Sequence, residues 1–143
     1  MMGGARAVAA VVDSSMALSW LFADERDDEA RQAARTVAKR GALVPAIFRW
    51  EIQNALAVAV RRGRILESQP SVLLARLDRV GLQTDAAILE LPLTTGFDLA
   101  ERFGLTVYDA AYLELARRRR TPLMTRDQKL AEAALALDLL WIH

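Results

Sequence analysis

The chain has 143 residues, 53% of them hydrophobic, and a formal net charge of +1. These values suit one globular domain and exclude both a disordered chain and a strongly basic surface for nucleic acid. The absence of cysteine excludes disulfides and is compatible with the cytoplasm, and no apolar run approaches the roughly 20 residues of a membrane span.

Residues 1–7 are expected to form a flexible tail before a single domain at residues 8–143. In the first half of this domain, short apolar runs alternate with amphipathic stretches. The expected elements are, in chain order, a strand at 8–12, helices at 16–22 and 27–40, a strand at 42–44 and a helix at 46–62.

The second half continues the alternation. Its expected elements are a helix at 68–80, a strand at 87–91, helices at 95–103 and 106–120, a strand at 123–125, a helix at 128–137 and a strand at 139–142. Strands that alternate with helices predict an α/β fold, with a small parallel sheet flanked by helices. Such a sheet binds ligands beyond the carboxyl ends of its strands.

Four acidic residues lie where packing alone does not require them. Asp13 and Asp127 follow predicted strands, whereas Glu51 and Asp109 lie on the apolar arcs of predicted helices. Two carboxylates about 4 Å apart repel by roughly 4 kcal/mol at an effective dielectric constant of about 20. Because a divalent cation removes this repulsion and Mg²⁺ and Mn²⁺ prefer oxygen ligands, we expect the four acids to be catalytic metal ligands.

Each acid also has a plainer interpretation when it is considered alone. Asp13 and Asp127 suit helix N-caps, and Asp109 suits the positive end of a helix dipole. Glu51 suits an ion pair with an arginine at the rim of the core. Only the four acids together specify a metal site.

Three polar residues are expected to support these ligands. Ser14 follows Asp13 directly, Asn54 borders the same helix face as Glu51, and Thr125 precedes Asp127 by two positions. A carboxylate cluster with its metal can position a water, lower the pKa of that water and stabilise the charge that develops at a phosphoryl group.

No other catalytic set competes with the acids. The single histidine is the C-terminal His143, which argues against a Ser-His-Asp triad, and the chain has no phosphate-binding glycine loop. An aspartyl-phosphate phosphatase usually needs a second aspartate two positions after the first, where this chain has Ser15.

Four segments that carry the acids resemble those of the PIN-domain ribonucleases, and most closely the VapC-type toxins of type II toxin–antitoxin systems. The segments read VVDSS, WEIQNAL, VYDAAYLELA and TRDQKL, and the third is the most specific. The resemblance extends over residues 8–142. The four acids of the family fall on Asp13, Glu51, Asp109 and Asp127.

This resemblance implies a PIN-like three-layer domain that acts as a metal-dependent endoribonuclease with Mg²⁺ or Mn²⁺. It also implies a homodimer, an RNA substrate, and a cognate antitoxin whose tail blocks the site. Two other readings stay open: an α/β domain that only binds partners without catalysis, and a metal-dependent phosphatase for small phosphoesters.

The sequence does not decide the roles of two expected surface features. Arg117–Arg120 ends a predicted helix, and suits either a solvated helix end or contact with RNA phosphates. Trp50 lies off the apolar arc of its helix and is the better candidate for an exposed interface residue.

Overall fold

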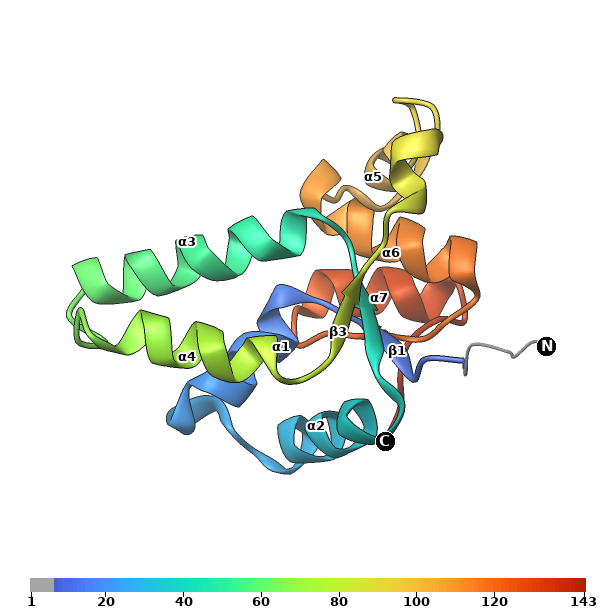
Figure 1. The fold of residues 1–143 in the computed structure, drawn as a ribbon. Coiled ribbons are helices and arrows are strands. Elements are labelled where there is room, and N and C mark those ends of the chain that lie inside the picture. The colour runs from blue at the N-terminus through green and yellow to red at the C-terminus, as the bar shows by residue number, and fades with distance from the viewer. Residues whose placement is uncertain (1–6) are drawn as a thin grey trace.

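A sheet of four short parallel strands lies at the centre of the computed structural model (Figure 1). The strands are β1 (Ala10–Val12), β2 (Ala42–Val44), β3 (Leu82–Thr84) and β4 (Leu123–Met124), in the spatial order β3-β2-β1-β4. Every residue of β1, β2 and β4 is buried. Strands buried on both faces form nearly continuous apolar runs, which is why the sequence predicts these three.

Helices flank the sheet on both sides (Figure 1). They are α1 (Ser14–Leu21), α2 (Asp28–Arg40), α3 (Ile47–Arg61), α4 (Gln69–Asp78), α5 (Phe97–Phe103), α6 (Val107–Arg119) and α7 (Gln128–Ala136). The pair α3–α4 extends to one side, whereas α6 contacts α5, α7 and β1 on the other. The predicted fold class, a small parallel sheet flanked by helices, is confirmed.

Helix α2 illustrates how local sequence sets an element. Asp27 caps its start by accepting a hydrogen bond of 3.0 Å from the backbone N–H of Ala30. Ala33 and Val37 continue the buried stripe at helical spacing. Gly41 ends the helix with a φ of 77°, which side chains with a Cβ rarely adopt.

The third strand was predicted in the wrong place. Residues 87–91 contain a 3₁₀ helix, η2 (Ala87–Glu90), and the strand that pairs with β2 is β3. The last two residues of β3, Gln83 and Thr84, are exposed and polar, because it is an edge strand. It therefore lacks the apolar run by which a buried strand is recognised.

The last predicted strand, at residues 139–142, is also wrong as a regular strand. Leu140 forms only an isolated parallel bridge with Leu123. The backbone N–H of Leu123 donates to the Leu139 carbonyl at 2.7 Å, and Trp141 donates to Leu123 at 3.0 Å. Because β4 has only two residues, its partner has no length over which to form a ladder.

A buried ion-pair cluster fixes α6 to the end of β3. The guanidinium of Arg118 lies 2.6 Å from a carboxylate oxygen of Asp85 and 2.8 Å from one of Glu114. The side chains of Asp85 and Glu114 are only 3% and 7% exposed. Buried carboxylates require such a partner, so Arg118 has a structural role.

The structure describes residues 7–143. The tail expected at residues 1–7 therefore lies, apart from Ala7, outside the described residues. Within the described range, no helix combines the length and the apolar character that crossing a membrane would need.

Candidate active site

Asp13 and Thr125 are neighbours because they follow two paired strands. β1 and β4 run parallel with Val12 opposite Met124, so the next residue of each strand leaves the sheet at the same edge. The backbone N–H of Asp13 donates to the Met124 carbonyl at 3.1 Å. The hydroxyl of Thr125 donates to Oδ2 of Asp13. A sequence separation of 112 residues thus becomes a direct contact.

Asp13 is a buried acid with several hydrogen-bond donors and no cationic partner within salt-bridge distance among the described residues. The hydroxyl of Ser15 donates to its two oxygens at 2.7 and 3.0 Å, and the backbone N–H of Met16 donates at 2.9 Å. Burial nevertheless raises the pKa of Asp13 to about 6, and the nearby charge of Asp127 contributes to the rise. A cation at this carboxylate would offset the cost of its ionisation.

The loop between β4 and α7 brings Asp127 to the same edge. The backbone N–H of Arg126 donates to Ser15 Oγ at 2.8 Å, and that of Asp127 donates to Thr125 Oγ1 at 3.0 Å. Asp127 is exposed and caps α7 through one carboxylate oxygen, which accepts from the Leu130 N–H at 2.8 Å. Its N-cap interpretation is therefore correct, and its other oxygen is not used by the cap.

A side chain from the same loop anchors it to α2. The guanidinium of Arg126 contacts both carboxylate oxygens of Asp27, at 2.8 and 2.7 Å, and Glu29 at 3.1 Å. Such bidentate pairs restrict orientation as well as distance. Arg126 thus ties the loop that carries Asp127 to the first turn of a different helix.

Glu51 is half-buried on α3 and is held by a tyrosine from α6. The hydroxyl of Tyr112, a residue only 1% exposed, donates to Glu51 Oε1 at 2.5 Å. Burial raises the pKa of Glu51, and the charge of Asp109 adds to the rise, whereas Tyr112 and Ser14 act to lower it. The expected neighbour Asn54 is exposed, and no hydrogen bond joins it to Glu51 among the described residues.

Asp109 lies in the first turn of α6, where it is half-buried. Its backbone N–H donates to the hydroxyl of Thr106 at 3.1 Å, which caps the helix. Burial raises the pKa of Asp109, Asp127 raises it further, and the ammonium of Lys129 acts in the opposite direction. Asp109 is therefore close enough to Asp127 and to Glu51 for their charges to interact.

The four acids form one connected acidic neighbourhood, in which the charge of Asp127 raises the pKa of Asp13 and of Asp109, and the charge of Asp109 raises the pKa of Glu51. They do not form a closed ligand set. Within residues 7–143, no three His, Cys, Asp or Glu side chains converge closely enough to hold a metal ion as they stand. The neighbourhood is a candidate active site because the acids of three helix starts and one helix face repel one another across it.

Two functional candidates were missed by sequence reasoning. Ser15 connects Asp13 to the loop that carries Asp127, and Tyr112 connects α6 to Glu51. The spacing of Tyr112 three residues after Asp109 was a usable signal, since residues at that spacing share a helix face.

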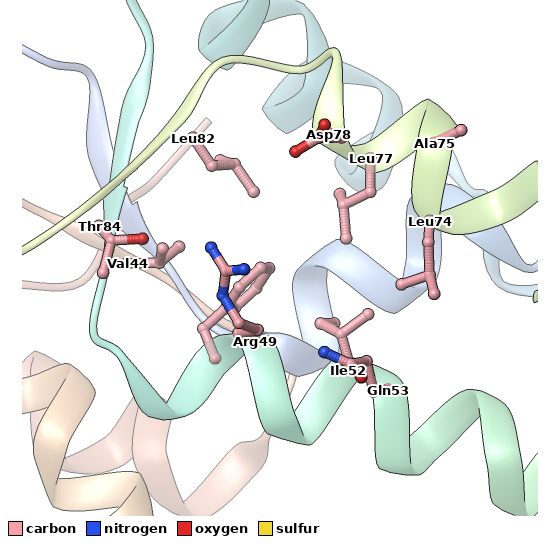
Figure 2. A pocket seen from close by; sticks show the side chains of 11 residues that line it. Val44, Arg49, Ile52, Gln53, Leu74, Ala75, Leu77, Asp78, Leu82 and Thr84 are labelled. Atoms are coloured by element: carbon pink, nitrogen blue, oxygen red, sulfur yellow. The ribbon is translucent and has the colours of Figure 1, made fainter. Parts of the chain in front are cut away.

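A separate cavity of about 360 Å³ lies between α3, α4 and β3 (Figure 2). None of the four acids lines it. Apolar and polar side chains both line it, with Ile52, Leu74 and Leu77 on the helices, and Arg49 and Asp78 on opposite sides of it (Figure 2). The acidic neighbourhood and this cavity are distinct places in the fold.

The four arginines at the end of α6 do not form one uniform surface. Arg117 pairs with Asp98 at 3.0 Å, and Arg118 belongs to the buried ion-pair cluster. Arg119 and Arg120 are exposed, and no ion pair involves them among the described residues. The interpretation of this run as a solvated helix end therefore fits Arg119 and Arg120 but not Arg117 and Arg118, which form ion pairs.

The chain is similar to known proteins in both sequence and fold. The family model of the PIN domain matches residues 10–135. Ribonuclease VapC3 from Pyrobaculum aerophilum is 33% identical over 127 residues, which cover 89% of this chain and 95% of the relative. The crystal structure of PAE2754, also from Pyrobaculum aerophilum, superimposes with a TM-score of 0.67 at 25% identity. It covers 92% of this chain and 83% of that one.

Proposed function

The chain belongs to the PIN-domain family, and from that premise we propose that it is a metal-dependent endoribonuclease, the toxin of a toxin–antitoxin module. The observation that carries this proposal is the acidic neighbourhood around the buried carboxylate of Asp13. A relative with 33% identity that bears the name ribonuclease supports the same reaction class.

We propose Asp13, Glu51, Asp109 and Asp127 as the residues that hold Mg²⁺ or Mn²⁺. Their donor chemistry fits, because carboxylate oxygens are the ligands that these ions prefer, and the mutual repulsion of the acids is what a divalent cation relieves. When bound, the ion would activate water and neutralise charge at the phosphodiester.

The chain's own residues have separate roles in this proposal. Thr125 and Ser15 hold the carboxylate of Asp13 at the strand end, and Ser14 stands beside Glu51. Glu51 or Asp127 orients the attacking water. Of the three residues proposed to support the ligands, Ser14, Asn54 and Thr125, only Asn54 lacks a described contact with an acid of the site.

The proposal extends to organisation and partners. Residues 8–143 are proposed as a single nuclease domain that acts on RNA in the cytoplasm. A homodimer and a cognate antitoxin are proposed as protein partners, on the basis of the VapC-type relative. Trp50, with 63% of its surface exposed, is a candidate contact residue for either partner.

Expression of the chain without its antitoxin should slow the growth of a bacterial host, and Asp109→Asn should relieve this toxicity. The amide preserves the size of the side chain but removes the charge that a metal ligand needs. Growth curves at matched protein levels measure the effect. Asp28→Asn is the matched control, because Asp28 is 99% exposed on α2 and lies outside the site.

Growth inhibition of equal strength by the wild type and Asp109→Asn would contradict a catalytic toxin and favour a domain that acts by binding. The alternative function, a metal-dependent phosphatase for small phosphoesters, predicts a different result. The purified protein would then hydrolyse small phosphoesters and leave RNA intact.

Arg119 and Arg120 are the best candidates within their run for contact with RNA phosphates, because both are exposed and form no ion pair with another residue of 7–143. Replacing both with glutamine should weaken RNA binding and reduce the slope of log K against log salt by roughly 1.4–1.8 if each contacts one phosphate. Filter binding across a salt series measures the slope. Arg117→Gln is the control, and an unchanged slope in the double variant would leave this helix end without a role in binding.

A further inference from the structure

We propose that Tyr112 is a positioning residue, whose hydroxyl fixes the orientation of the Glu51 carboxylate for binding of the metal. This inference rests on the proposed function, since it concerns one of the four proposed ligands. It assigns a role to a residue of the core that carries no charge and that the acid pattern alone does not identify.

The first support is the geometry of the contact. Tyr112 lies on α6 and Glu51 on α3, and the hydrogen bond between them spans 61 positions of sequence. The ring of Tyr112 is 1% exposed, so packing fixes the place from which the hydroxyl donates. The bond therefore connects the half-buried carboxylate of Glu51 to a closely packed part of the core.

The second support is what Glu51 would do without this bond. A glutamate side chain has three rotatable torsions, and Glu51 is only half-buried, so solvent alone does not select one rotamer. Tyr112 bonds Oε1, which leaves Oε2 for a ligand. Hydrogen-bond partners that orient metal ligands typically raise metal affinity 10- to 100-fold.

The third support is the arrangement around the pair. Tyr112 follows Asp109 by three positions, so both side chains project from the same face of α6. One helix thus supplies a proposed ligand directly and orients a second ligand on another helix. A tyrosine that served only to fill the core would not need a carboxylate of the site as its acceptor.

The test measures Mn²⁺ affinity by electron paramagnetic resonance or calorimetry, which does not depend on turnover. Tyr112→Phe keeps the ring and should weaken Mn²⁺ binding roughly 10- to 100-fold. Glu51→Gln should weaken it as well, and Tyr112→Phe should have no further effect in the Glu51→Gln background. The chain has only two tyrosines, so Tyr108→Phe is the matched control and should bind as the wild type, because Tyr108 is 58% exposed.

A second measurement does not require the Tyr112 variant to fold. In Tyr108→Phe, Tyr112 is the sole tyrosine, and its resonance Raman doublet reports whether the hydroxyl donates strongly. We expect a strong-donor signal with and without Mn²⁺, and its loss in Glu51→Gln. Loss of the donor signal when Mn²⁺ binds would overturn the positioning role.

The outcomes separate this inference from the proposed function. Equal Mn²⁺ affinity in the wild type and Tyr112→Phe would overturn the role of Tyr112 and leave the metal site intact. An equal loss of affinity in the wild-type and Glu51→Gln backgrounds would also overturn it, because the effect would then not pass through Glu51. A wild-type protein that binds no Mn²⁺ would overturn both.

Discussion

Replacing Asp13 with asparagine should abolish RNA cleavage and, in the same protein, raise the stability of the metal-free state at neutral pH. The loss of cleavage should exceed a factor of about 100, because loss of a residue that merely orients a metal ligand already costs 10- to 100-fold. The gain in stability arises because the substitution removes a buried charge that has no cationic partner in the part of the chain that the structure describes. Few structural roles would change activity and stability in these opposite directions.

The sign of the stability effect follows from the pKa of Asp13. Burial raises it from 3.8 to about 6, so the folded state binds the proton more tightly than the unfolded state. The contribution of Asp13 to the free energy of unfolding is therefore most favourable below about pH 4, and it is lost as the pH rises through 6. The shift of about two pH units corresponds to roughly 3 kcal/mol at pH 7. Asparagine avoids this cost, although it accepts fewer hydrogen bonds, so we expect a gain of roughly 1–3 kcal/mol.

Urea unfolding in EDTA at pH 4 and at pH 7, together with a cleavage assay, measures both effects. The difference in stability between the variant and the wild type should be large at pH 7 and small at pH 4. Asp28→Asn is again the control and should change neither property, since its carboxylate is solvated. A variant that loses activity and stability together would indicate that Asp13 only caps α1.

The central part of the fold was predictable because its physics is local. Residues 42–44 form a strand as predicted, and α2 differs from its prediction only at its first residue, because apolar runs and helix caps determine both. The edge strand β3 and the bridge at Leu140 were not predictable in this way. Each depends on which segment is available to pair with a neighbouring strand, which is a property of the whole sheet.

The four candidate acids could be singled out in the sequence for a related reason. A carboxylate within an apolar pattern is conspicuous in the sequence, as Glu51 is on α3. The partners of the acids are not conspicuous. In the sequence, Tyr112 is indistinguishable from an ordinary core residue of a helix, and Ser15 from an ordinary residue of a helix start. Their roles depend on contacts between different elements, as does the ion pair of Arg126 with Asp27, which spans 99 positions.

Chelation of divalent metal by EDTA should stop RNA cleavage, and added Mg²⁺ or Mn²⁺ should restore it. The same ions should stabilise the wild type against unfolding. At a metal concentration of 100 times Kd, the expected gain is about 2.7 kcal/mol, and Asp13→Asn should gain much less because it lacks a proposed ligand. A thermal shift assay measured against metal concentration, alongside cleavage of labelled RNA, tests both expectations.

Potassium chloride at matched ionic strength is the control, because salt alone screens the repulsion among the four acids. Recovery with potassium as complete as with Mg²⁺ would show that screening suffices and that no specific site exists. Cleavage that persists in EDTA would exclude the metal mechanism, whatever the fate of the Asp13 variant. The acids as they stand do not converge into a ligand set, so binding must draw together carboxylates that now repel. Stabilisation that saturates with metal and depends on Asp13 is therefore the result that screening alone does not produce.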